Sequence, residues 1–349
     1  MPKNDYQHNL HRENTLKLRY LIQDLPSFCH DFFIAMEPLT TIKTRIAYAY
    51  DYKIFFQYLL SNGIIQKEKV SAIQAEDLDT ILPEDIEKYL DHLSYYKTSR
   101  GNLNRKNDNT GKARKLAAIR SLFDYLHKRR KIKANIARLV DMPKIREKPI
   151  IRLEPDEVAR LLDVVEKGEG LTERQKKYHE HTKSRDLAMI GLFLGTGIRV
   201  SECVGLNMSD FDFNINGFRV TRKGGNEVVL YFGDEVRDML LQYIEDRKKI
   251  QAKPGHEDAL FLSMQKTRIS TRTVQEIVKK YSRLIAPLKN ISPHKLRSTY
   301  GTNLYRETGD IYIVADVLGH KDVNTTKKHY AAISDDKRRM AARVVKLRD

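Results

Sequence analysis

The chain has 349 residues, and 63 lysines and arginines against 46 aspartates and glutamates give it a formal net charge of +17. At about 100–200 residues per domain, this length predicts two domains, or three at most. No apolar run approaches the ~20 residues of a membrane helix, and the polar N-terminus lacks the apolar core of a secretory signal. We therefore expect a cytoplasmic, nucleoid-associated protein with no membrane contact and a polyanionic partner, nucleic acid before any other.

The first part of the chain, residues 1–143, predicts a helical DNA-binding domain. A helix is expected from the Thr41 cap to Asn62-Gly63, with Ile42, Ile46, Tyr50 and Ile54 on one face. A second helix is expected over 84–97 and a third over 112–130. No segment of this domain alternates strongly enough to predict a strand.

The third predicted helix lies in the most basic part of the chain, since residues 105–148 hold 15 basic and four acidic residues. Its apolar positions recur at helical spacing, and basic side chains are interleaved with them. A solvated helix face explains these charges, but their clustering favours a face that binds DNA phosphates and releases counterions. The apolar stripe is Leu116, Ile119, Leu122, Phe123 and Leu126, and the predicted DNA-binding residues are Lys112, Arg114, Lys115 and Arg120.

A charged stretch with a proline at each end, 144–152, is typical of a linker, and residues 153–349 predict a second, mostly helical domain. A helix should begin near Pro155, and the polar segment 166–184 is expected to be a loop. Its His179-Glu180-His181 lacks a second ligand pair at helical spacing, so no metal is expected. Two cysteines, Cys29 and Cys203, are too few for a zinc ribbon.

Further along the second domain, the sequence predicts a buried helix over 186–194 that ends at a Gly-Thr-Gly turn. Two β-rich segments, 218–223 and 227–232, flank Gly224-Gly225-Asn226 and predict an antiparallel hairpin. The expected fold is mainly α with one small antiparallel sheet.

Four segments of the second domain carry polar residues beside structural breaks. Each has a plain explanation on its own: an Arg–Glu pair, an exposed turn lysine, a histidine near a Ser-Pro helix start, a tyrosine packed on the core. Together they suit one reaction, in which a tyrosine oxygen attacks a phosphodiester while two guanidinium groups hold the developing negative charge. This chemistry needs no metal and no cofactor. The residues are Arg199, Lys223, His294, Arg297, His320 and Tyr330.

At these residues the sequence resembles the tyrosine recombinases, the integrase family. The matching stretches are GTGIRVSE, TRKGGNE, SPHKLRSTYGTNLY, ADVLGH and NTTKKHY, and they occur in family order. Two N-terminal stretches, TTIKTRIAYAYDYKIFFQYL and KARKLAAIRSLFDYLHKRR, resemble the family's helical core-binding domain. The resemblance covers roughly residues 40–335 and implies a two-lobed DNA clamp.

The resemblance also implies a role for each residue. Arg199 and Arg297 match the arginines that clamp the scissile phosphate, and Glu202 matches a supporting acidic residue. Lys223 matches a general acid for the leaving 5′ oxygen. His294 matches a candidate general base, and His320 a residue that hydrogen-bonds the phosphate. Tyr330 matches the nucleophile that forms a 3′-phosphotyrosyl link.

Two positions depart from the family pattern. Ser298 stands where many members have a second histidine. The spacing between His320 and Tyr330 is ten residues where nine is usual, so we expect one extra residue in the turn before the last helix.

The resemblance further implies a homotetramer on two DNA duplexes, exchanging strands through a Holliday junction at a core site with inverted repeats. The segment 334–345 would dock on a neighbouring protomer, and an accessory protein is an option. A Xer-type role in dimer resolution and a mobile-element integrase both fit. A type IB topoisomerase-like enzyme and a DNA-binding regulator without catalysis are the alternatives.

Overall fold

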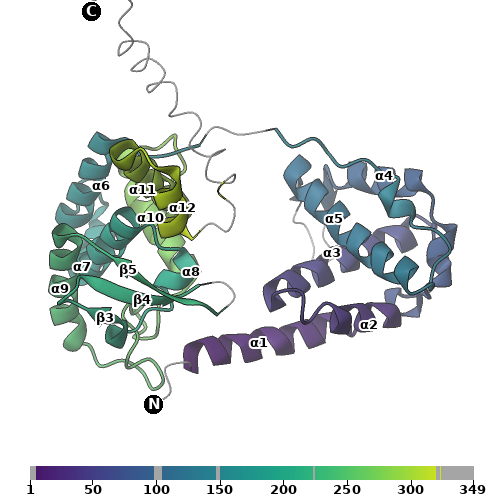
Figure 1. Cartoon of the computed structure of the whole chain (residues 1–349), viewed down its shortest axis with the longest axis horizontal. Helices are drawn as coiled ribbons and strands as arrows, with labels where there is room; N and C mark the ends of the chain where they lie inside the picture. The colour runs from purple at the N-terminus through teal and green to yellow at the C-terminus, as the bar shows by residue number, and fades with distance from the viewer. Residues whose placement is uncertain (1–4, 98–103, 147–149, 223–224, 320–322, 324–349) are drawn as a thin grey trace, which may run out of the picture. The chain divides into compact units, whose positions relative to one another are not determined.

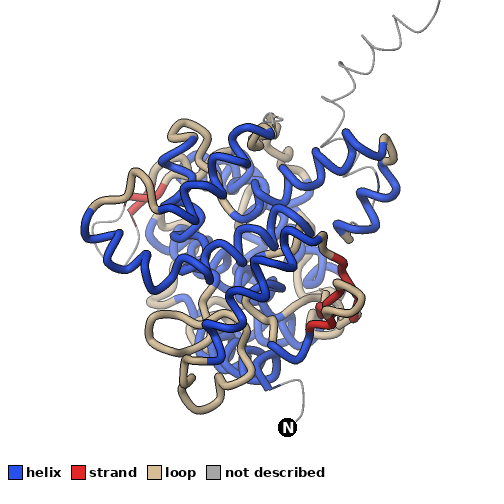
Figure 2. The backbone as a smooth tube through the Cα atoms, turned by 90° about the vertical axis from the view of Figure 1, so that its left-hand side faces the viewer, coloured by secondary structure: helices blue, strands red, loops and turns tan. Residues whose placement is uncertain are grey.

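The structure, a computed structural model, describes residues 5–97, 104–146, 150–222, 225–319 and 323. The chain divides into two compact units, Met1–Lys148 and Pro149–Asp349. Both units are mostly helical, as the cartoon in Figure 1 and the tube in Figure 2 show. The predicted fold class, mainly α with a small antiparallel sheet, is confirmed. None of the helices in these ranges is long and apolar enough to cross a bilayer.

The first unit is built mainly of helices. Its strand pair was not expected from the sequence, because two residues per strand are too few to show an alternating pattern. The helices are α1 (Asp5–Ile22), α2 (Ser27–Ala35), α3 (Ile42–Ser61), α4 (Pro83–His92) and α5 (Asn109–Lys128), with 3₁₀ turns η1 (Val70–Ala72), η2 (Glu76–Thr80) and η3 (Ile136–Arg138) and strands β1 (Tyr96–Lys97) and β2 (Asn104–Arg105).

The core of the first unit forms where α3 packs on its neighbours. The Thr41 hydroxyl accepts a hydrogen bond from the Thr44 amide at 3.3 Å, so α3 begins at the predicted cap. The predicted face of α3 is partly wrong, since Tyr50 is exposed. All five apolar residues predicted on α5 are buried, as are Tyr52, Phe55, Phe56 and Leu59 of α3.

The second unit contains the predicted hairpin within a three-stranded sheet. The strand order is β3-β4-β5, and Phe218 pairs with Leu230 across the hairpin. The elements are α6 (Pro155–Lys167), α7 (Glu173–Thr196), α8 (Val200–Cys203), η4 (Met208–Asp210), β3 (Phe211–Asp212), β4 (Gly217–Thr221), β5 (Glu227–Tyr231), α9 (Asp234–Lys248), α10 (Thr271–Ile285), α11 (Pro293–Thr308) and α12 (Ile311–Leu318).

The expectation of a loop over 166–184 is wrong, because α7 begins at Glu173 and runs without a break into the buried helix. Thr172 caps this helix, and the Gln175 side chain accepts a hydrogen bond from the Thr172 amide at 3.0 Å. This Thr-x-x-Gln capping box was the signal in the sequence.

A buried carboxylate fixes α7 against α10. Asp186 accepts hydrogen bonds from the Arg185 guanidinium at 2.7 Å and from the Tyr281 hydroxyl at 2.9 Å. Lys280 lies 3.3 Å from the same carboxylate. Since Asp186 is fully buried, the paired positive charges are what make its burial tolerable.

Candidate active site

The first site arginine follows directly from the end of α7. Gly197 ends this helix in the left-handed conformation, with φ of 62°. A Cβ at this position would lie 2.5 Å from a ring carbon of Tyr300, so glycine is required here for space as well as for conformation. The chain then turns and places Arg199 at the N-cap of α8.

Glu202 holds Arg199 by two hydrogen bonds. Its Oε2 accepts from the Arg199 amide at 2.9 Å, and its Oε1 accepts from Nη1 of the Arg199 guanidinium at 2.8 Å. The Glu202 side chain is buried, whereas that of Arg199 is about one-third exposed. The carboxylate therefore fixes both the backbone and the side chain of Arg199 while leaving the guanidinium accessible.

The second site arginine, Arg297, projects from α11 and is buried. Its guanidinium donates to the carbonyl of Gly197 and to the carbonyl of Leu318, the last residue of α12. Arg199 donates from Nη2 to the same Leu318 oxygen at 3.1 Å and to the Gly319 oxygen at 2.9 Å. The two predicted clamp arginines therefore meet at one carbonyl oxygen.

A third arginine, which is not among the site residues predicted from the sequence, reaches the same helix end. Arg222 follows β4 and donates to the carbonyls of Val317 at 2.7 Å and Asp316 at 3.3 Å. Burial, followed by the nearby positive charge of Arg199, lowers the pKa of Arg222 from its usual value. The carbonyls at a helix C-terminus carry partial negative charge, which favours this gathering of cations.

His294 lies on the first turn of α11, three residues before Arg297, and its side chain is exposed. Ser292 and Pro293 occupy the N-cap and the first helical position, as predicted. The hydroxyl of Ser298, the residue that departs from the family pattern, donates to the His294 carbonyl at 3.1 Å.

The remaining predicted site residues, Lys223, His320 and Tyr330, lie outside the described residues, as does the segment 334–345. Their roles stay predictions. Lys223 directly follows Arg222 in the chain, and His320 directly follows Gly319.

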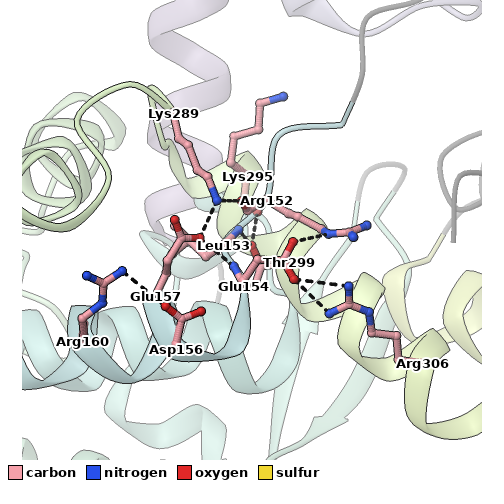
Figure 3. Close-up of polar contacts among 10 residues, drawn as sticks. All are labelled: Arg152, Leu153, Glu154, Asp156, Glu157, Arg160, Lys289, Lys295, Thr299 and Arg306. Atoms are coloured by element: carbon pink, nitrogen blue, oxygen red, sulfur yellow. Dashed lines mark hydrogen bonds and ion pairs between the residues drawn. The ribbon is translucent and has the colours of Figure 1, made fainter. Parts of the chain in front are cut away.

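A polar cluster fixes α11 against the start of the second unit (Figure 3). The Leu153 amide donates to the Thr299 hydroxyl at 3.0 Å, and Arg306 of α11 contacts Glu154 at 3.2 Å. Lys289 donates to Glu157. Burial opposes the ionisation of Glu157, but hydrogen bonds from Lys289 and the Glu154 amide lower its pKa below the usual value. The helix that carries His294 and Arg297 is thereby held in place.

The four predicted DNA-binding residues of α5 differ in their surroundings. Arg114 forms a two-bond ion pair with Asp51 of α3 and is half-exposed. Lys115 is buried and bonds the same carboxylate at 2.9 Å. Arg120 donates to the carbonyls of Ala137 and Val140, and Lys112 donates to the Ser94 hydroxyl at 2.7 Å.

Lys115 therefore departs from the expectation of a solvent-facing cation, because α5 turns it toward Asp51 in the core of the first unit. Arg120 ties α5 to the η3 turn. Of the four residues, Arg114 is the exposed one.

His179, considered above for metal binding, is buried, and its Nε2 lies 2.7 Å from the Val165 carbonyl. Within the described ranges, no group of three or more His, Cys, Asp or Glu side chains is arranged to hold a metal ion.

Residues 151–337 match the phage integrase family. The tyrosine recombinase XerC of Caldanaerobacter subterraneus is 34% identical over 321 residues, covering 86% of this chain and 82% of the relative. The tyrosine recombinase XerS of Lactococcus lactis is 26% identical, and the match covers 93% of this chain and 96% of the relative.

Solved structures share the fold. The Tn1549 transposon integrase in complex with a circular intermediate DNA has a TM-score of 0.64 and 19% identity, covering 91% of this chain and 99% of that one. XerH bound to a palindromic difH substrate, in a post-cleavage complex, has a TM-score of 0.62 and 19% identity, and the match covers 86% of this chain and 78% of that one.

Proposed function

Because the chain belongs to the phage integrase family and is a tyrosine recombinase, an enzyme of site-specific DNA recombination, we propose that its active site is built around the end of α12. Arg199 and Arg297 bind the scissile phosphate in this proposal, and Glu202 orients Arg199.

One observation carries the proposal: the guanidinium groups of Arg199 and Arg297 converge on the carbonyl oxygen of Leu318, from positions 119 and 21 residues earlier in the chain. Because both planar guanidiniums point to the Leu318 oxygen, a phosphate bound next to this oxygen could contact both of them through its own oxygens. Such fixed donors stabilise negative charge as it grows on the phosphoryl oxygens.

In this proposal, side chains of the protein carry out each step of the reaction. The Tyr330 oxygen attacks the phosphorus while His294 accepts the phenolic proton, and the bond to the 5′ oxygen breaks. Lys223 gives a proton to that oxygen, and His320 hydrogen-bonds the phosphate. The products are a 3′-phosphotyrosyl link and a free 5′-hydroxyl. Attack by the 5′-hydroxyl of the partner duplex reverses these steps and rejoins the strands without ATP or a cofactor.

The assembly belongs to the same proposal. Residues 1–143 and 153–349, joined by 144–152, form a clamp on duplex DNA with an inverted-repeat core site. Four copies exchange strands through a Holliday junction, and each passes the segment 334–345 to a neighbour.

The biological role that we propose is Xer-type dimer resolution at the nucleoid, in the cytoplasm, in support of chromosome segregation. Relatives named XerC and XerS, whose sequences match most of this chain, support it. The fold shared with the Tn1549 transposon integrase keeps mobile-element integration as the second candidate. Control by an accessory protein is compatible with both.

A covalent-trapping experiment tests the chemistry. The bound DNA sequence is first selected from a random pool, and a nicked suicide duplex carrying that site is incubated with the protein. We expect an adduct at Tyr330 that leaves a free 5′-hydroxyl and that is lost in Tyr330→Phe. An adduct of unchanged yield in Tyr330→Phe would overturn the nucleophile assignment. Relaxation of a plasmid that lacks the site would instead favour the topoisomerase alternative.

A further inference from the structure

The last turn of α12 is capped by arginines from three separate elements. The final carbonyls of an α-helix have no partner within the helix, so other donors must satisfy them. At α12 these donors are Arg199 before α8, Arg222 after β4 and Arg297 on α11. The site already described uses the first and the third of these arginines, and it assigns no task to Arg222.

Arg222 donates to carbonyl oxygens of α12 other than the one that Arg199 and Arg297 share. It bonds the carbonyls of Asp316 and Val317, whereas Arg199 and Arg297 meet at Leu318. A phosphate held by the two clamp arginines would therefore compete with the Leu318 carbonyl for their donors and not with the acceptors of Arg222.

Gly319 is shaped to admit this guanidinium. It ends α12 in the left-handed conformation, with φ of 60°, and a Cβ added there would overlap the Arg222 guanidinium. The close approach thus depends on a residue without a side chain.

We propose that Arg222 is a positioning residue that fastens the β4–β5 hairpin to the end of α12. The proposal rests on the proposed function, because its purpose is to set Lys223, the next residue in the chain, as general acid for the leaving 5′ oxygen. A hairpin released from α12 delivers that proton less often, while the arginine clamp and the DNA-binding surface stay as they are. The loss should therefore fall on departure of the leaving group and spare binding.

A change of leaving group separates this role from a general structural one. In the test substrate, sulfur replaces the bridging 5′ oxygen at the cleavage site. A thiol has a pKa of about 8.5, far below that of an alcohol, so a thiolate leaves without an added proton. With the normal suicide duplex at saturation, we expect Arg222→Ala to slow adduct formation roughly 10–100-fold. With the sulfur duplex, its rate should return to within about three-fold of the unmodified protein.

Matched variants complete the design. Arg219→Ala removes an equal charge from an exposed position on β4, the strand that Arg222 follows, and should leave both rates unchanged. Arg222→Lys keeps the charge but has a single donor nitrogen in place of the two that Arg222 uses, so its rate should fall between those of the unmodified protein and Arg222→Ala. If Arg222→Ala does not fold, Arg222→Gln takes its place, and folding is verified by thermal melting.

Rescue of both Lys223→Ala and Arg222→Ala by sulfur supports the proposal. Rescue of Lys223→Ala alone, or an Arg222→Ala protein that cleaves the normal duplex at full rate, overturns the proposal and leaves the proposed function standing. Failure of sulfur to rescue Lys223→Ala overturns the general-acid role of Lys223, and the positioning role falls with it.

Discussion

Glu202 binds Arg199 twice, once through the backbone amide and once through the guanidinium, at 2.9 and 2.8 Å. The carboxylate is buried against the start of α8, so it has little freedom to turn elsewhere. Arg199 is therefore held in a fixed orientation before any phosphate arrives, which lowers the reorganisation needed in the reaction.

Replacing Glu202 with glutamine should disturb this orientation without removing a group that touches DNA. The amide presents a donor to one of the two Arg199 donors, so one hydrogen bond is lost. We expect adduct formation on the suicide duplex to slow roughly 10–100-fold, with site affinity unchanged. Single-turnover cleavage and gel-shift titration measure the two quantities. An equal loss in both would show that Glu202 serves DNA binding instead.

Replacing Arg297 with alanine should remove one half of the phosphate clamp. We expect cleavage to fall by about 10²–10³-fold, because one fixed donor group at a developing charge contributes that much. Site binding should stay within about three-fold, since many other cations contact the DNA backbone. The same pair of measurements applies, with Arg283→Ala on α10 as a control for charge. A loss of binding as severe as the loss of cleavage would argue against the clamp role.

Because Arg297 is also bonded to the Gly197 and Leu318 carbonyls, the variant needs a folding control. Alanine removes the donor to the Gly197 carbonyl, whereas the Leu318 carbonyl keeps its bond from Arg199, so the expected loss of stability is about 1–3 kcal/mol. A variant that melts cooperatively but does not cleave separates the chemical role from this loss of stability.

The sequence predicted best where local spacing decides the structure. The five apolar residues of α5 recur every three or four positions, and all are buried. On α3 the same reasoning chose Tyr50, which is exposed, because Asp51 is buried there by its ion pairs with α5. Spacing cannot reveal a buried polar residue whose partner lies more than sixty positions away. The first half of α7 was missed because its polar composition outweighed the capping box.

The site residues show the same division. The motifs predicted Arg199, Glu202, His294 and Arg297, and the structure brings Arg199, Glu202 and Arg297 together at the end of α12. Arg222 was missed, since its contacts are main-chain carbonyls 94 and 95 residues away, which no sequence pattern marks. Lys115 was assigned to DNA because its charge was visible in the sequence and its buried partner on α3 was not.

Removing the buried carboxylate at Asp186 should cost far more stability than removing an exposed one. Asp186→Ala leaves Arg185 and Lys280 as positive charges in a buried site, and breaking such a pair typically costs about 3–5 kcal/mol. Glu173→Gln breaks an exposed pair with Lys176 and should change stability by less than about 0.5 kcal/mol. Urea denaturation measures both free energies of unfolding. Equal losses would contradict a special role for the buried cluster.

The pair formed by Glu157 and Lys289 should make stability depend on pH. Its hydrogen bonds lower the pKa of Glu157 in the folded state from 4.5, so the unfolded chain takes up a proton first as the pH falls. The stabilisation is complete above the unfolded pKa and is lost as the pH falls through the folded one. We expect Glu157→Gln to be less stable by about 1 kcal/mol at pH 7 and to converge with the unmodified protein in acid. Urea titrations of both proteins across this range measure the difference, and a gap that widens in acid would contradict it.

Arg114 and Lys115 share the Asp51 carboxylate but differ in exposure, which allows a matched test of the DNA contacts predicted for α5. Arg114 is half-exposed, so its guanidinium can pair with a phosphate; Arg114→Gln should weaken site binding and reduce the slope of log affinity against log salt by about one. Lys115 is buried, so Lys115→Met should leave that slope unchanged and instead lower the free energy of unfolding by about 1–3 kcal/mol.

Binding titrations at several salt concentrations measure the slope, and urea denaturation measures the stability. The opposite pattern would be a salt slope that is reduced in Lys115→Met and unchanged in Arg114→Gln. It would mean that the face of α5 that now packs against Asp51 of α3 binds DNA instead. The ion pairs that now join α3 to α5 would then have to open on binding.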